Sequence, residues 1–352
     1  MGVSGDMQDR TKSMLKVAPG FAVAVAIALV SRFIEGLLPI HLIGASVIAL
    51  FIGMAVNAFW RPAALAPGLT FTSKKVLKFA IILLGASLSV GTILTVGRMS
   101  LTVMCFTLLA CFGVGYPVGR ALGLNWRLSN LISAGTGICG GSAIAAIAPV
   151  IDAEDSDIAY AMSATFLFDM AMIVLFPIMG RWLNLSDMAY GLWSGTAVND
   201  TSSVVAAGYA FSEAAGDFAT MVKLTRTLSI IPTVLVFAFI NIRLKQKQAA
   251  AQGSEAAAVG GKVSFRSLFP WFIVGFVGLA AVNSFGVIPA AVSYGAKELS
   301  KFLMVAALAA IGLNTSFKEM KKSGVAPMLH GFIISALVVV VAITVEYCMG
   351  IV

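Results

Sequence analysis

Two polar runs interrupt hydrophobic segments of this 352-residue chain, at residues 135–146 and 195–206. The first reads GTGICGGSAIAA and the second, sixty positions later, reads GTAVNDTSSVVA. Glycines and small polar residues at the centre of a helix break the backbone hydrogen-bond ladder. Inside a bilayer, the freed backbone groups are tolerated only where they face protein or a water-filled cavity. Two such interruptions in one chain predict the binding site of a transporter.

Four ionisable residues lie in hydrophobic segments in or near these runs: Asp169, Asp200, Lys223 and Arg226. An ionisable residue inside a membrane segment is costly and is by default a functional hypothesis. Lys223 and Arg226 are three positions apart and therefore share a helix face. Two structural alternatives stay open. Lys223 would snorkel to the outer interface, or Asp169 would form a bridge with Arg226.

An anion suits this set of groups. A broken helix offers free N–H groups and the positive end of a half-helix dipole, and the two basic side chains add fixed positive charge. The predicted substrate-binding residues are Thr136, Gly137, Gly140, Gly141, Ser142, Asn199, Thr201, Ser202, Lys223 and Arg226. Asp200 and Asp169 are the predicted coupling residues, and the sequence does not separate H⁺ from Na⁺ as the coupling ion.

Neither a metal site nor a cofactor is expected. The cysteines occur singly in apolar segments, and the two histidines lie far apart, without metal-site spacing: Cys105, Cys111, Cys139, Cys348, His41 and His330. Buried thiols usually act as small hydrophobes. Cys139 nevertheless lies inside the first polar run and is a candidate to line the site.

Catalysis is a weak alternative. Ser142 would need a histidine base, and His330 is the only one inside a predicted span that could reach it. The Asp169–Asp200 pair lacks the Gly-x-Gly-Asp motif of intramembrane aspartyl proteases. We therefore do not expect an enzyme. An anion channel is the stronger alternative, because paired interruptions also build selectivity filters.

The composition is that of an integral membrane protein. Hydrophobic residues make up 59% and charged residues 11% of the chain, with a mean hydropathy of +0.96; soluble domains carry about 25% charged residues. Apolar runs of roughly 20 residues predict transmembrane helices and exclude the shorter alternating strands of a barrel. We predict an all-α polytopic fold with about eleven spans, near 19–38, 42–60, 75–96, 100–122, 128–151, 157–181, 189–210, 218–243, 268–286, 297–316 and 325–350.

The fifth and seventh predicted helices, 128–151 and 189–210, contain the polar runs and are therefore discontinuous. They are either broken full spans, which we favour, or re-entrant hairpins that would dip into the membrane from opposite faces. A weaker sequence similarity between residues 84–89 and 309–314 suggests an inverted repeat, because the third and tenth helices would run antiparallel.

The net charge of +8 is explained by membrane topology. If the helices alternate, eighteen of the 24 Lys and Arg residues fall on the side of the N-terminus. Only Arg32, Arg98, Lys297 and Lys301 fall on the other side. This positive-inside bias predicts a cytoplasmic N-terminus and a periplasmic or extracellular C-terminus. The expected partners are the lipid bilayer and a small anion, with no nucleic acid.

We expect one membrane domain. A cytoplasmic segment, 1–18, precedes helices one to eight (19–243), a flexible cytoplasmic loop (244–266) follows, and helices nine to eleven (267–352) end the chain. The first apolar stretch lacks a cleavage site and is read as a retained helix. The sequence leaves the oligomeric state open and is compatible with a homodimer.

Several stretches along the chain resemble one known family. They are residues 71–75, 84–86, 135–152, 191–193, 204–208, 222–226, 270–272 and 283–284. In this order they resemble the YeiH-type family of bacterial inner-membrane proteins, known as a sulfate exporter family. The resemblance implies a secondary transporter of sulfate or related anions. It also implies a place in a transporter superfamily whose members cross two broken helices at the membrane centre.

One position departs from that family. Many relatives carry His-Glu where this chain has Asn199-Asp200. The carboxylate is one methylene shorter and the imidazole is missing, so substrate or proton coupling would differ from theirs. The sequence as a whole predicts an inner-membrane carrier, an exporter or exchanger, of a small anion such as sulfate or an organosulfonate, coupled to H⁺ or Na⁺. The exact substrate and the direction of transport stay open.

Overall fold

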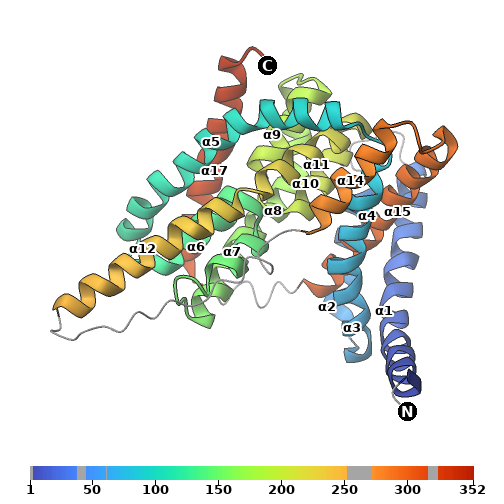
Figure 1. Ribbon diagram of the computed structural model, residues 1–352, viewed down its shortest axis with the longest axis horizontal. Helices are drawn as coiled ribbons and strands as arrows, with labels where there is room; N and C mark the ends of the chain where they lie inside the picture. Colours follow the sequence, from blue (N-terminus) through green and yellow to red (C-terminus); the bar gives the residue numbers. More distant parts are fainter. Residues whose placement is uncertain (1–2, 38–44, 61, 252–270, 316–323) are drawn as a thin grey trace.

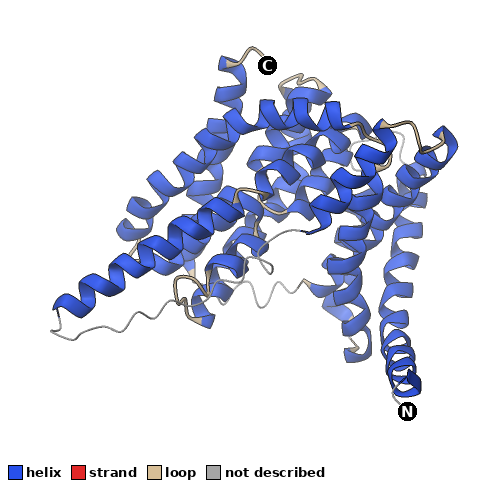
Figure 2. Ribbon diagram, viewed as in Figure 1, coloured by secondary structure: helices blue, strands red, loops and turns tan. Residues whose placement is uncertain are grey.

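The computed structural model describes residues 3–37, 45–60, 62–251, 271–315 and 324–352, and every regular element in these ranges is a helix (Figures 1 and 2). Five helical stretches are long and apolar enough to cross a membrane: Lys16–Leu37, Val90–Ala121, Ser156–Trp182, Glu213–Leu244 and Val325–Cys348. The all-helical class and a polytopic membrane protein are thus supported. The number of eleven spans stays a prediction.

One group of helices, which we call the flanking bundle, is formed by residues from the N-terminal quarter of the chain and from 271–314, around a central α15. Its elements are α1 (Val3–Leu37), α2 (Ala45–Phe59), η1 (Ala63–Leu65), α3 (Ala66–Phe71), η2 (Thr72–Val76), α4 (Leu77–Gly85), α14 (Trp271–Ser284) and α15 (Ala290–Asn314). Small residues let these helices touch backbone to backbone. A Cβ on Gly53 would lie 2.9 Å from the amide nitrogen of Leu313.

The second group, the hairpin bundle, contains both polar runs. Its elements are α5 (Val90–Ala121), α6 (Trp126–Ala134), η3 (Gly135–Cys139), α7 (Gly141–Ile147), α8 (Asp155–Trp182), α9 (Asp187–Ala197), α10 (Thr201–Phe211), α11 (Glu213–Thr227), α12 (Ile230–Ala251) and α17 (Val325–Cys348). The two bundles meet where α2 and α15 pack on α10 and where α14 packs on α5 (Figure 1).

The second polar run forms a helical hairpin. The Tyr190 hydroxyl on α9 donates to the carbonyl oxygen of Ala207 on α10 at 2.9 Å. The Tyr190 ring also stacks on Phe211, with 3.9 Å between the ring centroids. In a straight helix residues 190 and 207 would be about 25 Å apart. The favoured alternative of a broken full span is therefore wrong for this segment, since α9 and α10 lie side by side.

The first polar run also folds back on itself. The chain reverses at Gly140, whose φ of +67° is a conformation that L side chains rarely adopt. Gly135 lies against Ile144 on the returning helix α7, because a Cβ on Gly135 would be 2.8 Å from Ile144 Cδ1. Small residues at a helix break are compatible with either geometry, so the sequence pattern alone did not distinguish a hairpin from a full span.

Some helix boundaries also differ from the predictions. The turn predicted after residue 96 lies at residues 86–89, because Ser89 caps α5 by accepting a hydrogen bond from the Thr92 amide at 3.1 Å. Helix α1 begins at Val3, within the predicted polar segment 1–18. Helix α12 continues to Ala251, so the predicted loop 244–266 begins as helix, and its remainder lies outside the described residues.

Candidate functional site

The tips of the two hairpins touch one another. A Cβ on Gly140, at the tip of the first hairpin, would lie 3.0 Å from Cβ and Oδ1 of Asp200 at the tip of the second. We call residues 136–142 and 197–202 the hairpin crossing. The structure therefore brings both polar runs, and most of the predicted binding residues, to one place.

Lys223 joins the two tips from α11. Its ammonium group donates to the carbonyl oxygen of Ile138 at 2.8 Å and to that of Val198 at 3.0 Å. The side chain is fully buried, so the snorkelling alternative is wrong. These carbonyls lie at the C-terminal ends of η3 and α9, where the helix dipole is negative. The lysine charge compensates both helix ends.

Arg226, one turn further along α11, also donates to carbonyl groups at the negative ends of the same two helices. Its Nε donates to the Gly137 carbonyl at 2.7 Å, Nη2 to Thr136 at 2.6 Å, and Nη1 to Val198 at 3.3 Å. The residue is 1% exposed. In this conformation the guanidinium group binds backbone oxygens of the protein and is not open to solvent.

The two carboxylates lie at the second tip where α10 begins, at the positive end of the helix dipole. Asp169, on α8, accepts the backbone amides of Asn199 and Asp200, each at 2.9 Å. Within the described residues it forms no ion pair with Arg226, so the bridge considered from the sequence is not formed. Asp200 caps α10 by accepting the Ser202 amide at 2.9 Å and the Ser202 hydroxyl.

Ser335 on α17 is a member of the crossing that the sequence analysis missed. Its hydroxyl lies 3.5 Å from the Thr136 hydroxyl and accepts the Asn199 side-chain amide at 3.4 Å. The signal in the sequence was a serine in the middle of an apolar span. Asn199 Oδ1 is buried without a hydrogen-bond partner in the described part of the chain. Such an orphan acceptor leaves room for a donor.

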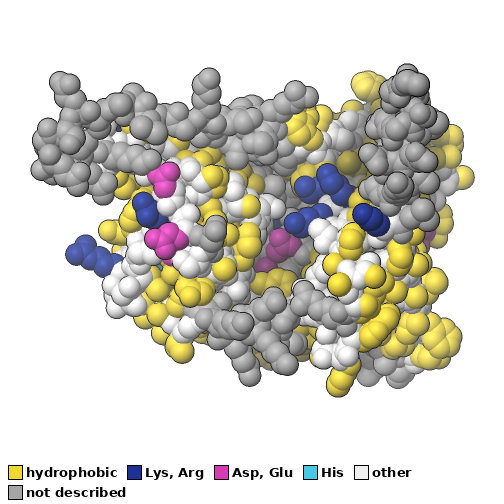
Figure 3. All heavy atoms as spheres, turned by 90° about the horizontal axis from the view of Figure 1, so that it is seen from below, with side chains coloured by type: hydrophobic (Ala, Val, Ile, Leu, Met, Phe, Trp, Pro, Cys, Tyr) yellow, Lys and Arg dark blue, Asp and Glu magenta, His cyan; other side chains and the backbone are white. Residues whose placement is uncertain are grey.

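Part of the crossing is accessible. Ser142 is exposed, and Gly141, Asp200 and Thr201 are half-buried, whereas Cys139 is buried. Seen from below, the molecule has a recess near the middle of this face, with acidic atoms inside it and basic side chains beside it (Figure 3).

The hairpin crossing has no net formal charge, because the two positive charges of Lys223 and Arg226 cancel the two negative charges of Asp169 and Asp200.

The structure does not bring Ser142 and His330 together as a catalytic pair. His330 Nε2 lies 2.8 Å from the Gly115 carbonyl and 3.4 Å from the Ser129 hydroxyl. The described residues also contain no group of three or more His, Cys, Asp or Glu side chains able to hold a metal ion.

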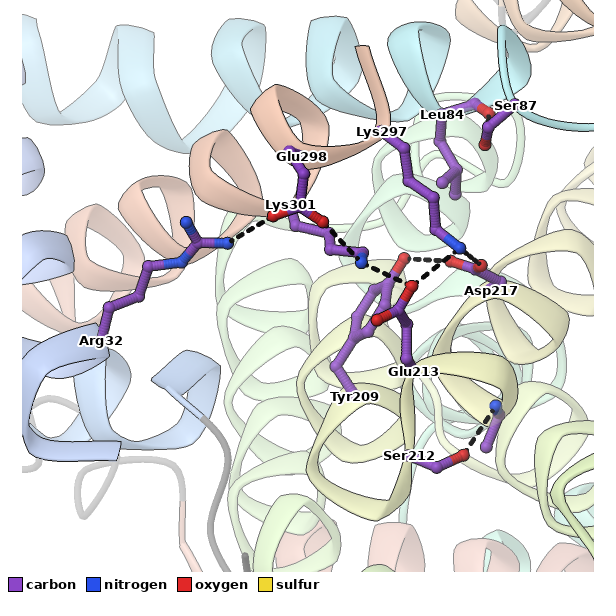
Figure 4. A network of polar contacts seen from close by, with 11 residues as sticks. Arg32, Leu84, Ser87, Tyr209, Ser212, Glu213, Asp217, Lys297, Glu298 and Lys301 are labelled. Carbon is purple, nitrogen blue, oxygen red and sulfur yellow. Dashed lines mark hydrogen bonds and ion pairs between the residues drawn. The ribbon is translucent and has the colours of Figure 1, made fainter. Parts of the chain in front are cut away.

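A second polar cluster connects the two bundles (Figure 4). Lys297 on α15 pairs with Asp217 at 2.7 Å and Glu213 at 2.9 Å on α11, and Lys301 pairs with Glu213 at 2.6 Å. We call these four residues, with Glu298 and Arg32 behind them, the inter-bundle ion-pair network. A cavity of about 560 Å³ lies beside it, between α1, α2 and α15 and residues 209–213.

Comparison with known proteins gives a consistent result. Residues 19–331 match the family described as conserved hypothetical protein 698. A membrane protein of Clostridium tetani, called UPF0324 membrane protein, is 56% identical over 338 residues, covering 95% of this chain and 98% of the relative. A protein of Streptococcus pneumoniae with the same name is 37% identical over 345 residues, covering 96% and 98%. One of Fusobacterium nucleatum is 38% identical over 332 residues, covering 88% and 92%.

Proposed function

The chain belongs to the UPF0324 family of membrane proteins (conserved hypothetical protein 698), and from this premise we propose that it is a secondary transporter of a small anion, coupled to H⁺ or Na⁺. Sulfate or a related sulfur oxyanion is the proposed substrate. The observation that carries the proposal is the meeting of two helical hairpins, tip to tip, around buried charges of both signs. Binding sites of secondary transporters lie between such discontinuous helices.

The hairpins enter the membrane from opposite faces in this proposal. Only α8 lies between them in the chain, and its apolar stretch of 27 residues is long enough for one crossing. Both tips would then meet near the middle of the bilayer. Counting each hairpin as no crossing leaves nine spans, an odd number, so the termini keep their opposite sides. The location is the bacterial plasma membrane, with the N-terminus in the cytoplasm.

The balance of charges at the hairpin crossing supports coupling. Two cations and two carboxylates already cancel, so an added anion would be an uncompensated charge in a water-poor site, which is costly. A cation must therefore enter with the anion. Asp200 is the half-buried carboxylate of the two, whereas Asp169 is buried against two amides. Asp200 is therefore the proposed carrier of a proton or ligand of Na⁺.

The inter-bundle ion-pair network supports a cycle of alternating access. The charge rule assigns its basic residues Arg32, Lys297 and Lys301 to the outer side, whether the two hairpins are counted as spans or not. The recess in Figure 3 opens on the face where α12 and α7 end. The ion pairs would close the outer side while the cytoplasmic side is open.

The proposal is tested by charge movement in proteoliposomes on a solid-supported membrane. Sulfate, thiosulfate and small carboxylates are applied as concentration jumps, with and without a pH or Na⁺ gradient. We expect a saturable, gradient-dependent signal that is absent in Arg226→Gln and present in Arg98→Gln, an exposed arginine outside the crossing.

Two results would contradict the carrier. Equal signals in Arg226→Gln and the wild type would remove the crossing from the transport path. A current far above carrier turnover, without counterflow of labelled anion, would indicate an anion channel instead. Electroneutral exchange is detected by the same counterflow measurement.

A further inference from the structure

Three lysines lie close together on one helix of the flanking bundle: Lys74, Lys75 and Lys78. The helix is continuous through α3, η2 and α4, and the first two lysines lie in its π-helical turn, a feature frequent at functional sites. All three side chains are exposed. Within the described residues none forms an ion pair; Lys78 only lies over the Phe272 ring, at 5.5 Å from its centroid.

Helix packing shows how deep these lysines lie. Gly68 packs against the backbone of Val17 and Gly20, at the beginning of the apolar stretch Lys16–Leu37. At 1.5 Å per residue, Lys74 is about 9 Å and Lys78 about 15 Å further along the helix from Gly68. The hydrocarbon core of a bilayer is about 30 Å thick. Lys78 therefore lies near half-depth.

The neighbouring helix gives the same level independently. Ser300 donates its hydroxyl hydrogen to the Ala80 carbonyl at 2.6 Å, and Ser300 lies close to the middle of α15 (Ala290–Asn314). Lys78 is two residues from Ala80. Two different contacts thus place the lysine cluster well inside the span of the flanking bundle.

An ammonium group at this depth is stable only if it faces water or a counter-charge. The described residues supply no carboxylate to these three. We therefore expect water to reach them from a recess in the surface, and the view from below has a recess with basic side chains beside it (Figure 3). Three ammonium groups beside water, spread along the helix from about 9 to 15 Å beyond Gly68, leave a strong positive potential, because the surrounding protein and lipid screen charge weakly.

We infer that Lys74, Lys75 and Lys78 form a binding site for a small oxyanion with at least two negative charges. A compact oxyanion accepts hydrogen bonds in several directions, and each lysine presents three donors. A monovalent anion such as chloride would gain less from three cations. The site deepens the proposed function and rests on it, since it names the flanking bundle as the place where the anion is first held.

The first test is sulfate binding by the purified protein in detergent, measured by isothermal titration calorimetry. The variant carries Lys74→Gln, Lys75→Gln and Lys78→Gln together, and the matched control is Lys16→Gln, an exposed lysine at the end of the apolar stretch. We expect sulfate affinity to fall about tenfold or more in the triple variant, and to stay unchanged in the control. Chloride at the same ionic strength should not compete in the wild type.

Two outcomes would overturn the site: an unchanged sulfate affinity in the triple variant, or a wild type that binds neither sulfate, phosphate nor thiosulfate. The outcome for transport is separate. Loss of binding in the triple variant of a protein that moves no anion would refute the transporter and keep the site. Normal transport with normal binding in the triple variant would keep the transporter and refute the site.

A second measurement asks whether the site faces water. Lys74→Cys is made in a background with Cys105 and Cys348, the two exposed cysteines, replaced by Ser. In oriented vesicles a membrane-impermeant maleimide should label it from one face only, and sulfate should slow the reaction. Phe33→Cys, on an exposed apolar position of α1, serves as the lipid-facing control. A folded Lys74→Cys protein that reacts from neither face would place the lysines in lipid and exclude the site.

Discussion

Basic residues occur in two contrasting regions of this molecule. In the hairpin bundle, Lys223 and Arg226 are buried and donate to backbone carbonyls at the ends of two helices. In the flanking bundle, Lys74, Lys75 and Lys78 are exposed and without ion partners among the described residues. The first pair stabilises a break in the backbone; the second group has its charge free for a ligand. The same residue type therefore has a structural or a binding role according to what already occupies its donors.

The largest effect is expected for Lys223→Met. It leaves the carbonyls of Ile138 and Val198 without their donor and removes a buried charge that balances a carboxylate. Breaking a buried charge network by removing one member costs about 3–5 kcal/mol, so we expect poor expression or a melting temperature about 10 °C lower. Thermal unfolding in detergent measures this change in melting temperature.

Lys78→Met is the matched substitution in the other region. Its expected change in stability is within about 0.5 kcal/mol, because the side chain is exposed and unpaired. If both variants melted at the same temperature, the contrast between the two regions would be lost.

Asp200→Asn tests whether the carboxylate at the hairpin crossing couples transport to a cation. The amide oxygen still caps α10, so the fold should persist, but the side chain no longer takes up a proton. Wild-type transport should depend on the pH or Na⁺ gradient, because a cation must enter with the anion at this charge-balanced site. The variant should lose this gradient dependence. A variant that keeps the wild-type pH and Na⁺ dependence would remove Asp200 from coupling.

The inter-bundle ion-pair network allows a test with a smaller effect. Lys297→Glu places like charges beside Asp217 and Glu213, and adding Asp217→Lys restores one opposite pair. The coupling energy in a double-mutant cycle of melting temperatures should be about 1 kcal/mol. The single variant should also label faster at an engineered outer-side cysteine, such as Ser212→Cys. Equal labelling in the single and double variants would mean that these pairs do not hold the outer side closed.

A small effect of opposite sign is expected at Glu346 on α17. Its side chain is fully buried, and neither carboxylate oxygen has a hydrogen-bond partner among the described residues. A charged group in that position would be costly, so Glu346→Gln should be neutral or stabilise by up to about 1 kcal/mol. A large loss of melting temperature would show that the carboxylate has a partner beyond the described residues.

The sequence predicted the all-helical membrane class and the two breaks, because runs of glycine and polar residues in apolar segments have a direct physical cost. It did not predict that the breaks are hairpins. That geometry depends on contacts between distant residues, such as Tyr190 with Ala207, which leave no local pattern. The sequence correctly associated Asp169, Lys223 and Arg226 with the two breaks. Their hydrogen-bond partners could not be predicted, because they are backbone groups, which occur at every position of every sequence.

The charge count from the sequence assigned Lys74, Lys75 and Lys78 to the cytoplasmic side. Their depth became visible once Gly68 was found against Val17 and Gly20, and Ala80 against Ser300. Hydropathy places Lys74 and Lys75 at the border of a predicted helix, whereas the actual helix begins earlier, at Ala66. The earlier start moves Lys74 from outside the predicted span 75–96 into the helix and moves Lys75 and Lys78 away from its end.

One ammonium group holds both hairpins, since Lys223 binds Ile138 on one tip and Val198 on the other. Pulling the tips apart would strip that buried cation of its ligands, so the tips behave mechanically as one piece. Cargo seated between them would not be released by parting the hairpins. It would be carried along with them as they shift against the flanking bundle.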